Sequence, residues 1–296
     1  MNGFVLSGGA NLGSIQAGML EALLDAGITP GVLVGTSIGA ANAAFIAGDP
    51  TPDGARALSD IWRTVRARDV FPLSLLRLGR GLFREGSVFS PQPLRRFLER
   101  RLPYRAFEDA RVPLRITATR FENGEAVVFD SGPVIEAIMA STALPVVFPP
   151  HAIDGRHYLD GGLSDQVPLT PAIEAGADTI YVLSVGFPCP PPEHHRSARA
   201  VLMHSIGLLL SQRLRIDVTD LPRHHPALEV VHIPPVCTQV GLRDFSRSGV
   251  LIDRAREQTA AFLRGEECPA CPHPKPDGVP ATGLRIEVVA SRENPV

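Results

Sequence analysis

The chain has 296 residues, of which 44% are hydrophobic and 20% charged, and its 29 basic and 31 acidic residues leave a formal net charge of −2. This length suffices for a sizeable hydrophobic core. The balanced charge argues against nucleic-acid binding, which needs a dense basic surface. The sequence contains no run of 18 apolar residues and so predicts no membrane-spanning helix, and its N-terminus lacks the pattern of a secretory signal. We therefore expect a soluble, cytoplasmic globular protein.

Short apolar runs alternate with stretches of helical periodicity. Two strand–turn–helix units come first, with strands over 4–6 and 31–35 and helices over 13–26 and 38–47. Such units predict an α/β fold with parallel strands. The later predicted elements are, in order, mostly helical sequence over 54–104, a hairpin of strands over 114–120 and 125–129, a helix over 134–143, a strand over 179–185, a helix over 196–217, a strand over 228–233, a helix over 248–264 and an edge strand over 284–290.

The end of the chain differs from the rest in its prolines and cysteines, and the simplest division is one domain over 1–265 and a C-terminal extension over 266–296. Cys268 and Cys271, with His273 close behind, could form half of a zinc site. A disulfide or free thiols explain a single Cys-x-x-Cys pair better. We therefore expect no metal and no cofactor.

A serine lies between two glycines where the second predicted strand meets the following helix. In Gly35-Thr36-Ser37-Ile38-Gly39 a sharp turn would raise the hydroxyl above the strand ends, while the glycines allow close backbone approach. The helix N-terminus favours negative charge that develops next to it. The pattern predicts a nucleophile at Ser37, and the simpler interpretation is a serine that only caps the helix.

A second glycine-rich turn follows the first predicted strand. Gly8, Gly9 and Ala10 can present backbone amides to an anion, as an oxyanion hole or a phosphate cradle. A dinucleotide fingerprint would need glycine in place of Ala10, and a Walker loop would need a lysine. The turn therefore predicts an oxyanion site or, more simply, close packing of strand and helix.

Asp160 is the candidate base for a nucleophilic serine, which needs one. It opens Asp160-Gly161-Gly162 on a flexible turn, so its carboxylate could point into a cleft. An ordinary α/β-hydrolase would place its elbow later in the chain and a histidine later still, so the early Ser37 does not fit that order. Taken alone, however, Asp-Gly-Gly is more often a plain turn.

Four blocks together resemble the patatin-like phospholipase family. They are residues 6–13, similar to its glycine-rich oxyanion loop; 35–40, similar to its nucleophile elbow; 141–150, similar to its Ala-x-Pro-x-x-Phe-x-Pro stretch; and 160–162, similar to its Asp-Gly motif. Their order and spacing agree over residues 4–168. The resemblance implies a three-layer α/β/α fold with a central, mostly parallel sheet, and a catalytic domain that extends to about residue 265.

The resemblance also implies a Ser–Asp dyad, in which Ser37 attacks an ester carbonyl and Asp160 accepts the proton and later activates water. The implied oxyanion hole consists of the backbone amides of Gly8, Gly9, Ala10 and Ile38. The glycines that support these motifs are Gly13, Gly35, Gly39, Gly161 and Gly162. The expected reaction is hydrolysis of carboxylic esters in (lyso)phospholipids or neutral lipids.

Two residues depart from the family's loop, which usually has a third glycine and then a basic residue where this chain has Ala10 and Leu12. Ala10 keeps its amide available provided that its φ stays negative. Leu12 removes a positive charge that could contact a phosphate headgroup. Neutral esters and lysophospholipids are therefore expected as substrates almost as much as diacyl phospholipids.

Two other functions stay open: a non-catalytic lipid- or acyl-binding protein with the same pocket, and a conventional Ser–His–Asp esterase. The leucine- and arginine-rich residues 73–83, and residues 206–216, could contact lipid, although packing on the core explains both. The expected partner is a lipid or small ester, reached by peripheral contact with a membrane where needed. Nucleic acid is not expected, and the oligomeric state is left open.

Overall fold

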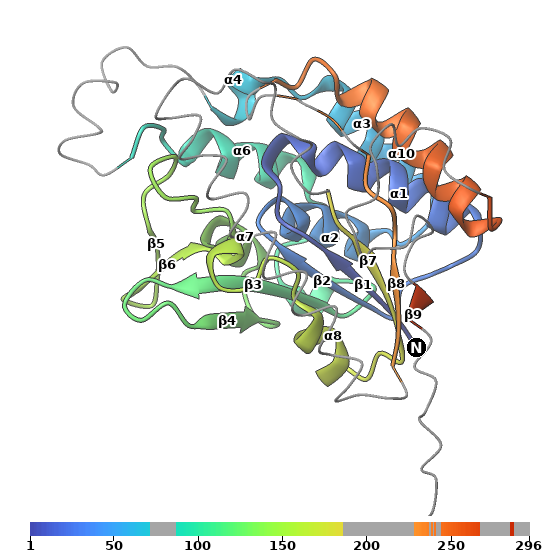
Figure 1. Ribbon diagram of the computed structural model, residues 1–296. Helices are drawn as coiled ribbons and strands as arrows, with labels where there is room; N and C mark the ends of the chain where they lie inside the picture. The colour runs from blue at the N-terminus through green and yellow to red at the C-terminus, as the bar shows by residue number, and fades with distance from the viewer. Residues whose placement is uncertain are drawn as a thin grey trace, which may run out of the picture.

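A mixed β-sheet forms the centre of the computed structural model, which describes residues 1–71, 87–185, 228–236, 238, 240, 244–266 and 285–286 (Figure 1). Its nine described strands are β1 (Asn2–Leu6), β2 (Val32–Thr36), β3 (Leu114–Arg120), β4 (Ala126–Phe129), β5 (His151–Ile153), β6 (Arg156–Asp160), β7 (Thr179–Leu183), β8 (Glu229–His232) and β9 (Arg285–Ile286). They are ordered β5-β6-β3-β2-β1-β7-β8-β9, and β4 pairs with β3.

The strands are parallel in the middle of the sheet and antiparallel towards both ends. β3, β2, β1, β7 and β8 run parallel to one another. β4 and β6 both pair antiparallel with β3, and β9 pairs antiparallel with β8. The parallel prediction is thus confirmed for the centre of a sheet that is mixed overall. The parallel centre brings the carboxyl ends of β1 and β2 to one edge, where α/β folds place their sites.

Helices cover both faces of this sheet. The described α-helices are α1 (Gly13–Asp25), α2 (Ile38–Gly48), α3 (Pro52–Thr64), α4 (Ala67–Val70), α6 (Gln92–Arg101), α7 (Val134–Ser141), α8 (Leu169–Glu174) and α10 (Ser248–Leu263), and the 3₁₀ turns are η1 (Ala10–Leu12), η3 (Phe107–Asp109) and η4 (Gly161–Leu163). In Figure 1, α1, α3 and α10 lie above the sheet and α8 below it. The result is a three-layer α/β/α arrangement, as predicted.

The alternation of side chains along β1 divides the hydrophobic core between the two faces. Phe4 and Leu6 pack into the larger cluster, which the helices α1, α2, α3, α6, α7 and α10 share. Val5 points to the opposite face and packs with Val34 and with Ala172 of α8. All these side chains are fully buried. In the described part, no helix combines the length and apolar character needed to cross a membrane.

Most predicted elements agree with the structure to within a few residues, and two local features differ. The sequence also predicts that Pro91 and Pro93 interrupt the helical region over 54–104, whereas in the structure Pro91 caps α6 and Pro93 lies in its first turn, where proline fits a helix. The Asn123-Gly124 pair predicts a tight hairpin, whereas β3 ends at Arg120 and β4 begins at Ala126, and within this longer loop the Gly124 amide donates to the Arg120 carbonyl.

Other predictions fall on residues that the structure does not describe. They are the helix over 196–217, the segments 73–83 and 206–216, and the Cys268/Cys271 pair. The described part of the edge strand, β9, does lie beside β8 at the end of the sheet. The division at residue 265 stays a prediction.

Candidate active site

Ser37 forms a sharp elbow between the last residue of β2 and the first residue of α2. Its φ of 54° and ψ of −123° are strained for a residue with a side chain, at a cost of about 1–3 kcal/mol. Gly39 makes the turn possible, because a Cβ there would collide with the Leu6 carbonyl oxygen. The predicted strand–elbow–helix geometry is therefore present, with the Ser37 side chain half-buried at the carboxyl end of the parallel strands.

Asp160 lies at the end of β6 and meets Ser37 across 123 positions of sequence. The Ser37 hydroxyl donates to Asp160 Oδ2 at 2.6 Å, and the Gly162 amide donates to Oδ1 at 2.8 Å. The first distance is typical of a hydroxyl on a charged carboxylate. The antiparallel pairing of β6 with β3 places Asp160 opposite Ala118. The two side chains selected from the sequence thus form a direct pair.

Burial controls the charge of this pair. Asp160 is 4% exposed, and the loss of solvent raises the pKa of its carboxyl to about 6, although its hydrogen bonds from Ser37 and Gly162 act in the opposite direction. A carboxylate with a pKa near 6 is a better proton acceptor than one at the usual value near 4, and it is still ionised at pH 7. The pair therefore combines a serine hydroxyl with a basic carboxylate.

The glycine-rich loop lies beside the elbow. Gly8 donates its amide to the Gln166 carbonyl at 3.3 Å, so that amide already has an acceptor. Among the described residues, the amides of Gly9, Ala10 and Ile38 have no acceptor, and Ile38 begins α2, where the first amides of a helix are free. Three of the four predicted oxyanion donors are thus unoccupied, and the fourth holds the loop.

The condition of a negative φ at Ala10 is not met. Ala10 has a φ of +51°, in the left-handed region that disfavours residues with a Cβ. The reason is local, because the chain must reverse immediately after Gly9 to begin the 3₁₀ turn η1. The missing third glycine therefore imposes strain at this position, while the Ala10 amide has no acceptor among the residues that the structure describes.

A buried polar network, which the sequence patterns did not reveal, fixes both ends of this loop. Gln16 donates to the Ser7 and Leu183 carbonyls at 2.8 and 3.0 Å. Asn42 donates to the Gly13 carbonyl at 2.9 Å and to Gln16 Oε1 at 2.8 Å, and the Trp62 indole donates to Asn42. The available signal was an amide side chain within each apolar helix, since buried amides must find partners.

Gln166 connects the glycine-rich loop to the turn that carries Asp160. Its side chain donates to the Gly8 carbonyl at 3.0 Å, while its own carbonyl accepts the Gly8 amide. A Cβ added to Gly8 or to Gly162 would collide with the side-chain oxygen of Gln166, so both glycines leave room for it. This two-way bond fixes the distance between the loop and the aspartate.

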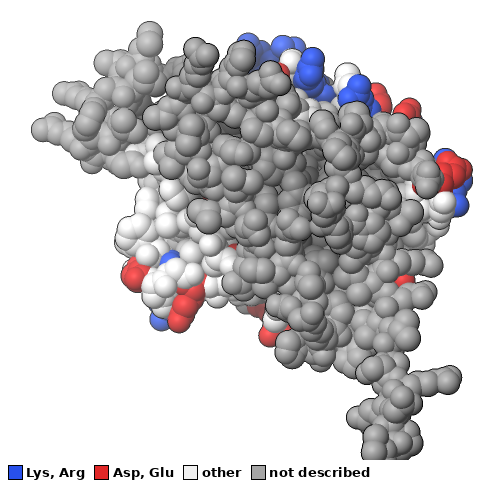
Figure 2. Space-filling view, viewed as in Figure 1, with Lys and Arg blue, Asp and Glu red and all other residues white. Residues whose placement is uncertain are grey.

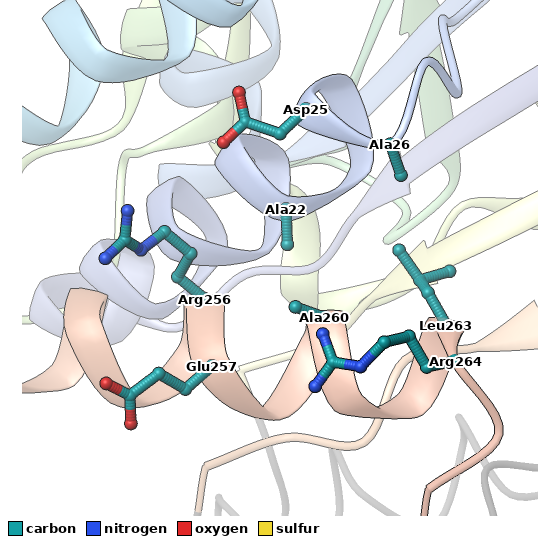
Figure 3. Close-up of a pocket in the computed structure, with 8 residues that line it drawn as sticks. All are labelled: Ala22, Asp25, Ala26, Arg256, Glu257, Ala260, Leu263 and Arg264. Atoms are coloured by element: carbon teal, nitrogen blue, oxygen red, sulfur yellow. The ribbon is translucent and has the colours of Figure 1, made fainter.

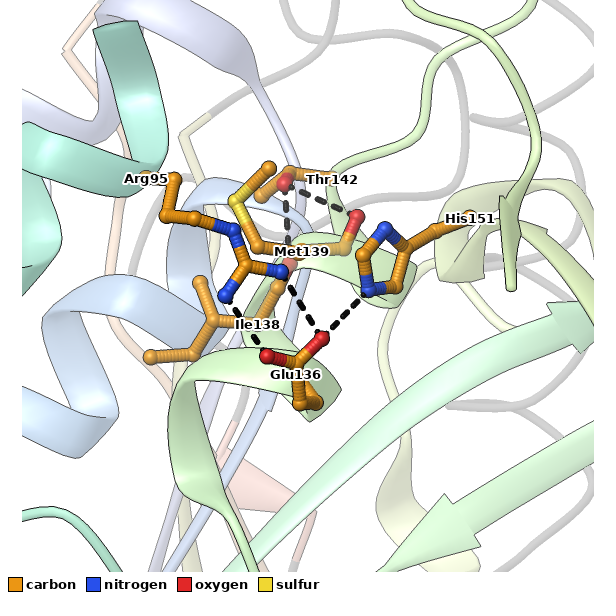
Figure 4. Close-up of polar contacts among 6 residues, drawn as sticks. All are labelled: Arg95, Glu136, Ile138, Met139, Thr142 and His151. Carbon is orange, nitrogen blue, oxygen red and sulfur yellow. Dashed lines mark hydrogen bonds and ion pairs between the residues drawn. The ribbon is translucent and has the colours of Figure 1, made fainter. Parts of the chain in front are cut away.

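Helix α7 supports the site from the side. Arg95 of α6 forms a bidentate ion pair with Glu136 in the first turn of α7, at 2.6 and 2.8 Å, and His151 approaches the same carboxylate at 2.9 Å (Figure 4). The hydrogen bonds from Arg95 lower the pKa of Glu136 to about 2, so this anchor is charged at all ordinary pH values. The opposite end of α7, at Ser141, reaches the elbow.

No described histidine bonds to Ser37. The described serine–histidine contact is between Ser184, which follows β7, and His232 Nε2, at 2.9 Å. Burial lowers the pKa of His232 to about 4, so its ring is neutral at pH 7. Within the described residues, no group of three histidine, cysteine or acidic side chains is arranged to hold a metal ion.

A separate groove of about 560 Å³ lies between α1 and α10 and contains none of the predicted site residues (Figure 3). Its lining residues are Ala22, Asp25, Ala26, Arg256, Glu257, Ala260, Leu263 and Arg264. Asp25 pairs with Arg56 at 2.7 Å, Arg256 lies 3.8 Å from Glu21, and Arg264 bonds Glu266. Three of the four charged residues in its lining thus already have charged partners.

An α/β fold with a strained serine elbow and a buried aspartate defines a serine-hydrolase-like class of protein. The family model described as Patatin-like phospholipase matches residues 4–173, more than half of the chain. The protein belongs to this family, as the sequence resemblance indicated.

Several known proteins share parts of the sequence or fold. An uncharacterized NTE family protein of Mycobacterium tuberculosis is 39% identical over 80 residues, which cover 27% of this chain and 22% of that protein. A lysophospholipase nte1 of Aspergillus terreus is 30% identical over 192 residues, 62% of this chain and 12% of the relative. The chain thus spans less than a quarter of the length of these relatives.

Two solved structures are similar to this chain at low sequence identity. VipD from Legionella pneumophila covers 90% of this chain and 67% of its own, with a TM-score of 0.49 and 15% identity. ExoU of Pseudomonas aeruginosa, in complex with SpcU, covers 90% of this chain and 52% of its own, with a TM-score of 0.47 and 16% identity.

Proposed function

We propose that the protein is a serine esterase that hydrolyses the carboxylic ester bonds of lipids through Ser37 and Asp160. The observation that carries this proposal is the 2.6 Å hydrogen bond from the Ser37 hydroxyl to a buried carboxylate at a strained elbow. Family membership supports lipid esters as the substrate class, and one of the similar proteins is named a lysophospholipase. No cofactor is needed for this chemistry.

In the proposed first step, Ser37 Oγ attacks the ester carbonyl carbon while its proton passes to Asp160. The carbonyl electrons move onto oxygen, where the free amides of Gly9, Ala10 and Ile38 would stabilise them. Each such donor is worth about 3 kcal/mol in the transition state. The tetrahedral intermediate then expels the alcohol, which takes the proton from Asp160, and an acyl-Ser37 ester remains.

In the second step, water attacks the acyl-Ser37 carbonyl while Asp160 accepts a proton from it. Collapse of the second intermediate releases the carboxylic acid and returns the proton to Ser37 Oγ. Asp160 thus alternates between base and acid, a role that its pKa of about 6 suits at neutral pH. Because Leu12 places no cation in the loop, we propose lysophospholipids and neutral esters as substrates alongside diacyl phospholipids.

A turnover assay separates this proposal from its two alternatives. The purified protein is expected to release acid from a short p-nitrophenyl ester and from a lysophospholipid, and Ser184→Ala is expected to stay within about twofold of wild type. A non-catalytic binding protein would bind the lipid without acid release. A conventional Ser–His–Asp esterase would lose its activity when one of its histidines is replaced by alanine in a histidine scan, and either result would contradict the proposal.

For access to lipid, we propose peripheral contact through an arginine-rich surface on α4 and α6. Residues 63–105 contain eleven arginines and three acidic residues, a net charge of +8, which leaves −10 for the rest of the chain. The arginine face consists of the exposed residues Arg66, Arg68, Arg96, Arg100 and Arg101. None of these forms an ion pair with a described acidic residue, and α4 packs against α6.

The arrangement within α6 favours an anionic partner. Arg96 and Arg100 are one helical turn apart, where like charges repel by a few tenths of a kcal/mol unless they are neutralised. Arg101 lies over the Phe97 ring at 5.9 Å. In Figure 2, basic side chains lie along the upper edge of the molecule, with acidic side chains beside them towards the right. An anionic lipid surface would gain about 1 kcal/mol for each such arginine near it.

Vesicle co-sedimentation in the inactive Ser37→Ala background tests this contact without hydrolysis. The protein should bind vesicles that contain phosphatidylglycerol more tightly than pure phosphatidylcholine, and less tightly at high salt. Arg96→Glu with Arg100→Glu should weaken binding at least tenfold. The matched control, Arg111→Glu with Arg156→Glu, reverses two exposed arginines elsewhere and should bind normally. Equal binding by both double variants would contradict the arginine face.

A further inference from the structure

Ser141, the last residue of α7, contacts the elbow at a point that no catalytic step uses. The Ser37 amide donates to Ser141 Oγ at 2.8 Å, and the Ser141 hydroxyl donates in turn to the Thr117 carbonyl at 2.6 Å. The Ser141 side chain is completely buried. One hydroxyl therefore joins the strained elbow residue, which follows β2, to the middle of β3.

The direction of these bonds is determined by the chemistry of the three groups. A serine hydroxyl has one proton to donate and can accept through its lone pairs. Because the Thr117 carbonyl takes the proton, a lone pair of Ser141 Oγ is left for the Ser37 amide. Thr117 lies opposite Thr36 in the β2–β3 register, so the acceptor belongs to the rigid centre of the sheet.

The same segment also holds the aspartate. The Asp160 amide donates to the carbonyl of Ala143, two residues after Ser141, at 3.0 Å. The first turn of α7 is tied to α6, since Glu136 binds Arg95, and the Thr142 hydroxyl closes the last turn of the helix by donating to the Ile138 carbonyl (Figure 4). The backbones of Ser37 and Asp160 are thus held by one short stretch of chain.

We infer that Ser141 is a positioning residue for this site, and that the C-terminal end of α7 sets the distance between Ser37 Oγ and Asp160. The inference rests on the proposed function for its catalytic meaning. The same contact excludes the Ser37 amide as an oxyanion donor, because that amide already donates its hydrogen bond to Ser141. Without the hydroxyl, the Ser37 amide loses its acceptor and the elbow is free to relax. A displacement of about 1 Å at a reacting atom lowers a rate about 100-fold.

Kinetics of Ser141→Ala test the positioning role. The variant should lower kcat about 30- to 100-fold per folded molecule and leave KM within about twofold, since Ser141 does not face the substrate. Ser141→Cys keeps a side chain of similar size with a weak acceptor, so its kcat should lie between those of the wild-type protein and Ser141→Ala. Ser184→Ala, which removes another buried hydroxyl, controls for stability and should keep full kcat. A full kcat in Ser141→Ala, measured per folded molecule, would overturn the inference.

Hydrogen exchange of the Ser37 amide separates this inference from the proposed activity. The amide should be protected in the wild-type protein and exchange at least tenfold faster in Ser141→Ala, whether or not the protein turns over an ester. Faster exchange in a protein without esterase activity would support the positioning role and contradict only the proposed function. Unchanged exchange would overturn the positioning role even in an active enzyme.

Discussion

Ser37→Ala is expected to reduce ester hydrolysis at least 10³-fold, to the background of the assay. The variant removes the only atom that the proposed mechanism uses to form the acyl intermediate, and the remaining amides of the glycine-rich loop cannot replace it. Alanine has the same backbone preferences as serine at the strained elbow, so the fold should persist. The measurement is the initial rate of p-nitrophenol release at pH 8, with circular dichroism to confirm folding.

Ser184→Ala is the matched control for this prediction, because it also removes a hydroxyl at the carboxyl end of a central strand. Its rate should stay close to wild type. If Ser37→Ala kept more than a tenth of the wild-type rate, another nucleophile would have to be found.

Asp160→Asn is expected to lower kcat about 10³-fold and, at the same time, to stabilise the fold. Loss of a general base typically costs 10²- to 10⁴-fold in rate. The asparagine has nearly the same shape and keeps an oxygen for the Gly162 amide. In the wild-type protein, kcat/KM should rise about tenfold per pH unit below pH 6 and level off above it, because only ionised Asp160 accepts the proton. This rise should be absent from the residual activity of the variant.

The sign of the stability effect follows from the direction of the pKa shift. Burial raises the pKa of Asp160 to about 6, above its value near 4 in the unfolded chain, so the folded state binds this proton more tightly. The favourable contribution is complete below about pH 4 and is lost as the pH rises through 6. Above pH 6 the buried charge lowers stability by about 2–3 kcal/mol, which asparagine avoids.

Thermal unfolding measured at pH 8 and at pH 4 checks this account of Asp160. The variant should melt several degrees above wild type at pH 8, and the difference should shrink at pH 4. A variant that loses activity and also melts below wild type at pH 8 would contradict the buried-charge account. Loss of less than tenfold in kcat would contradict the role of Asp160 as base.

The sequence was most informative where a short motif determines local geometry. The elbow at Ser37 could be predicted because the strand, the flanking glycines and the helix are contiguous. Asp160 could be selected for its turn, and its distance from Ser37 then depended on the pairing of β6 with β3. The central parallel strands followed from the strand–helix alternation, whereas the antiparallel pairings at the sheet ends required the structure.

The supporting contacts could not be predicted, because they join residues far apart in the chain. Gln16 reaches Leu183, and Gln166 reaches Gly8, through bonds that no local pattern encodes. Ser141 lay within the block that resembles the family, but only the structure shows its hydroxyl on the Ser37 amide. The positive φ at Ala10 could not be read from the sequence, because it depends on the course of the loop after Gly9, which a single alanine does not determine.

The central claim is that Ser37 is the reactive nucleophile, and mass spectrometry of the protein after treatment with a fluorophosphonate probe tests it most directly. The account predicts one phosphonyl adduct per molecule, located on Ser37, absent from Ser37→Ala and retained in Ser184→Ala. An unlabelled wild-type protein, or an adduct located on Ser184 or any other residue, would contradict it.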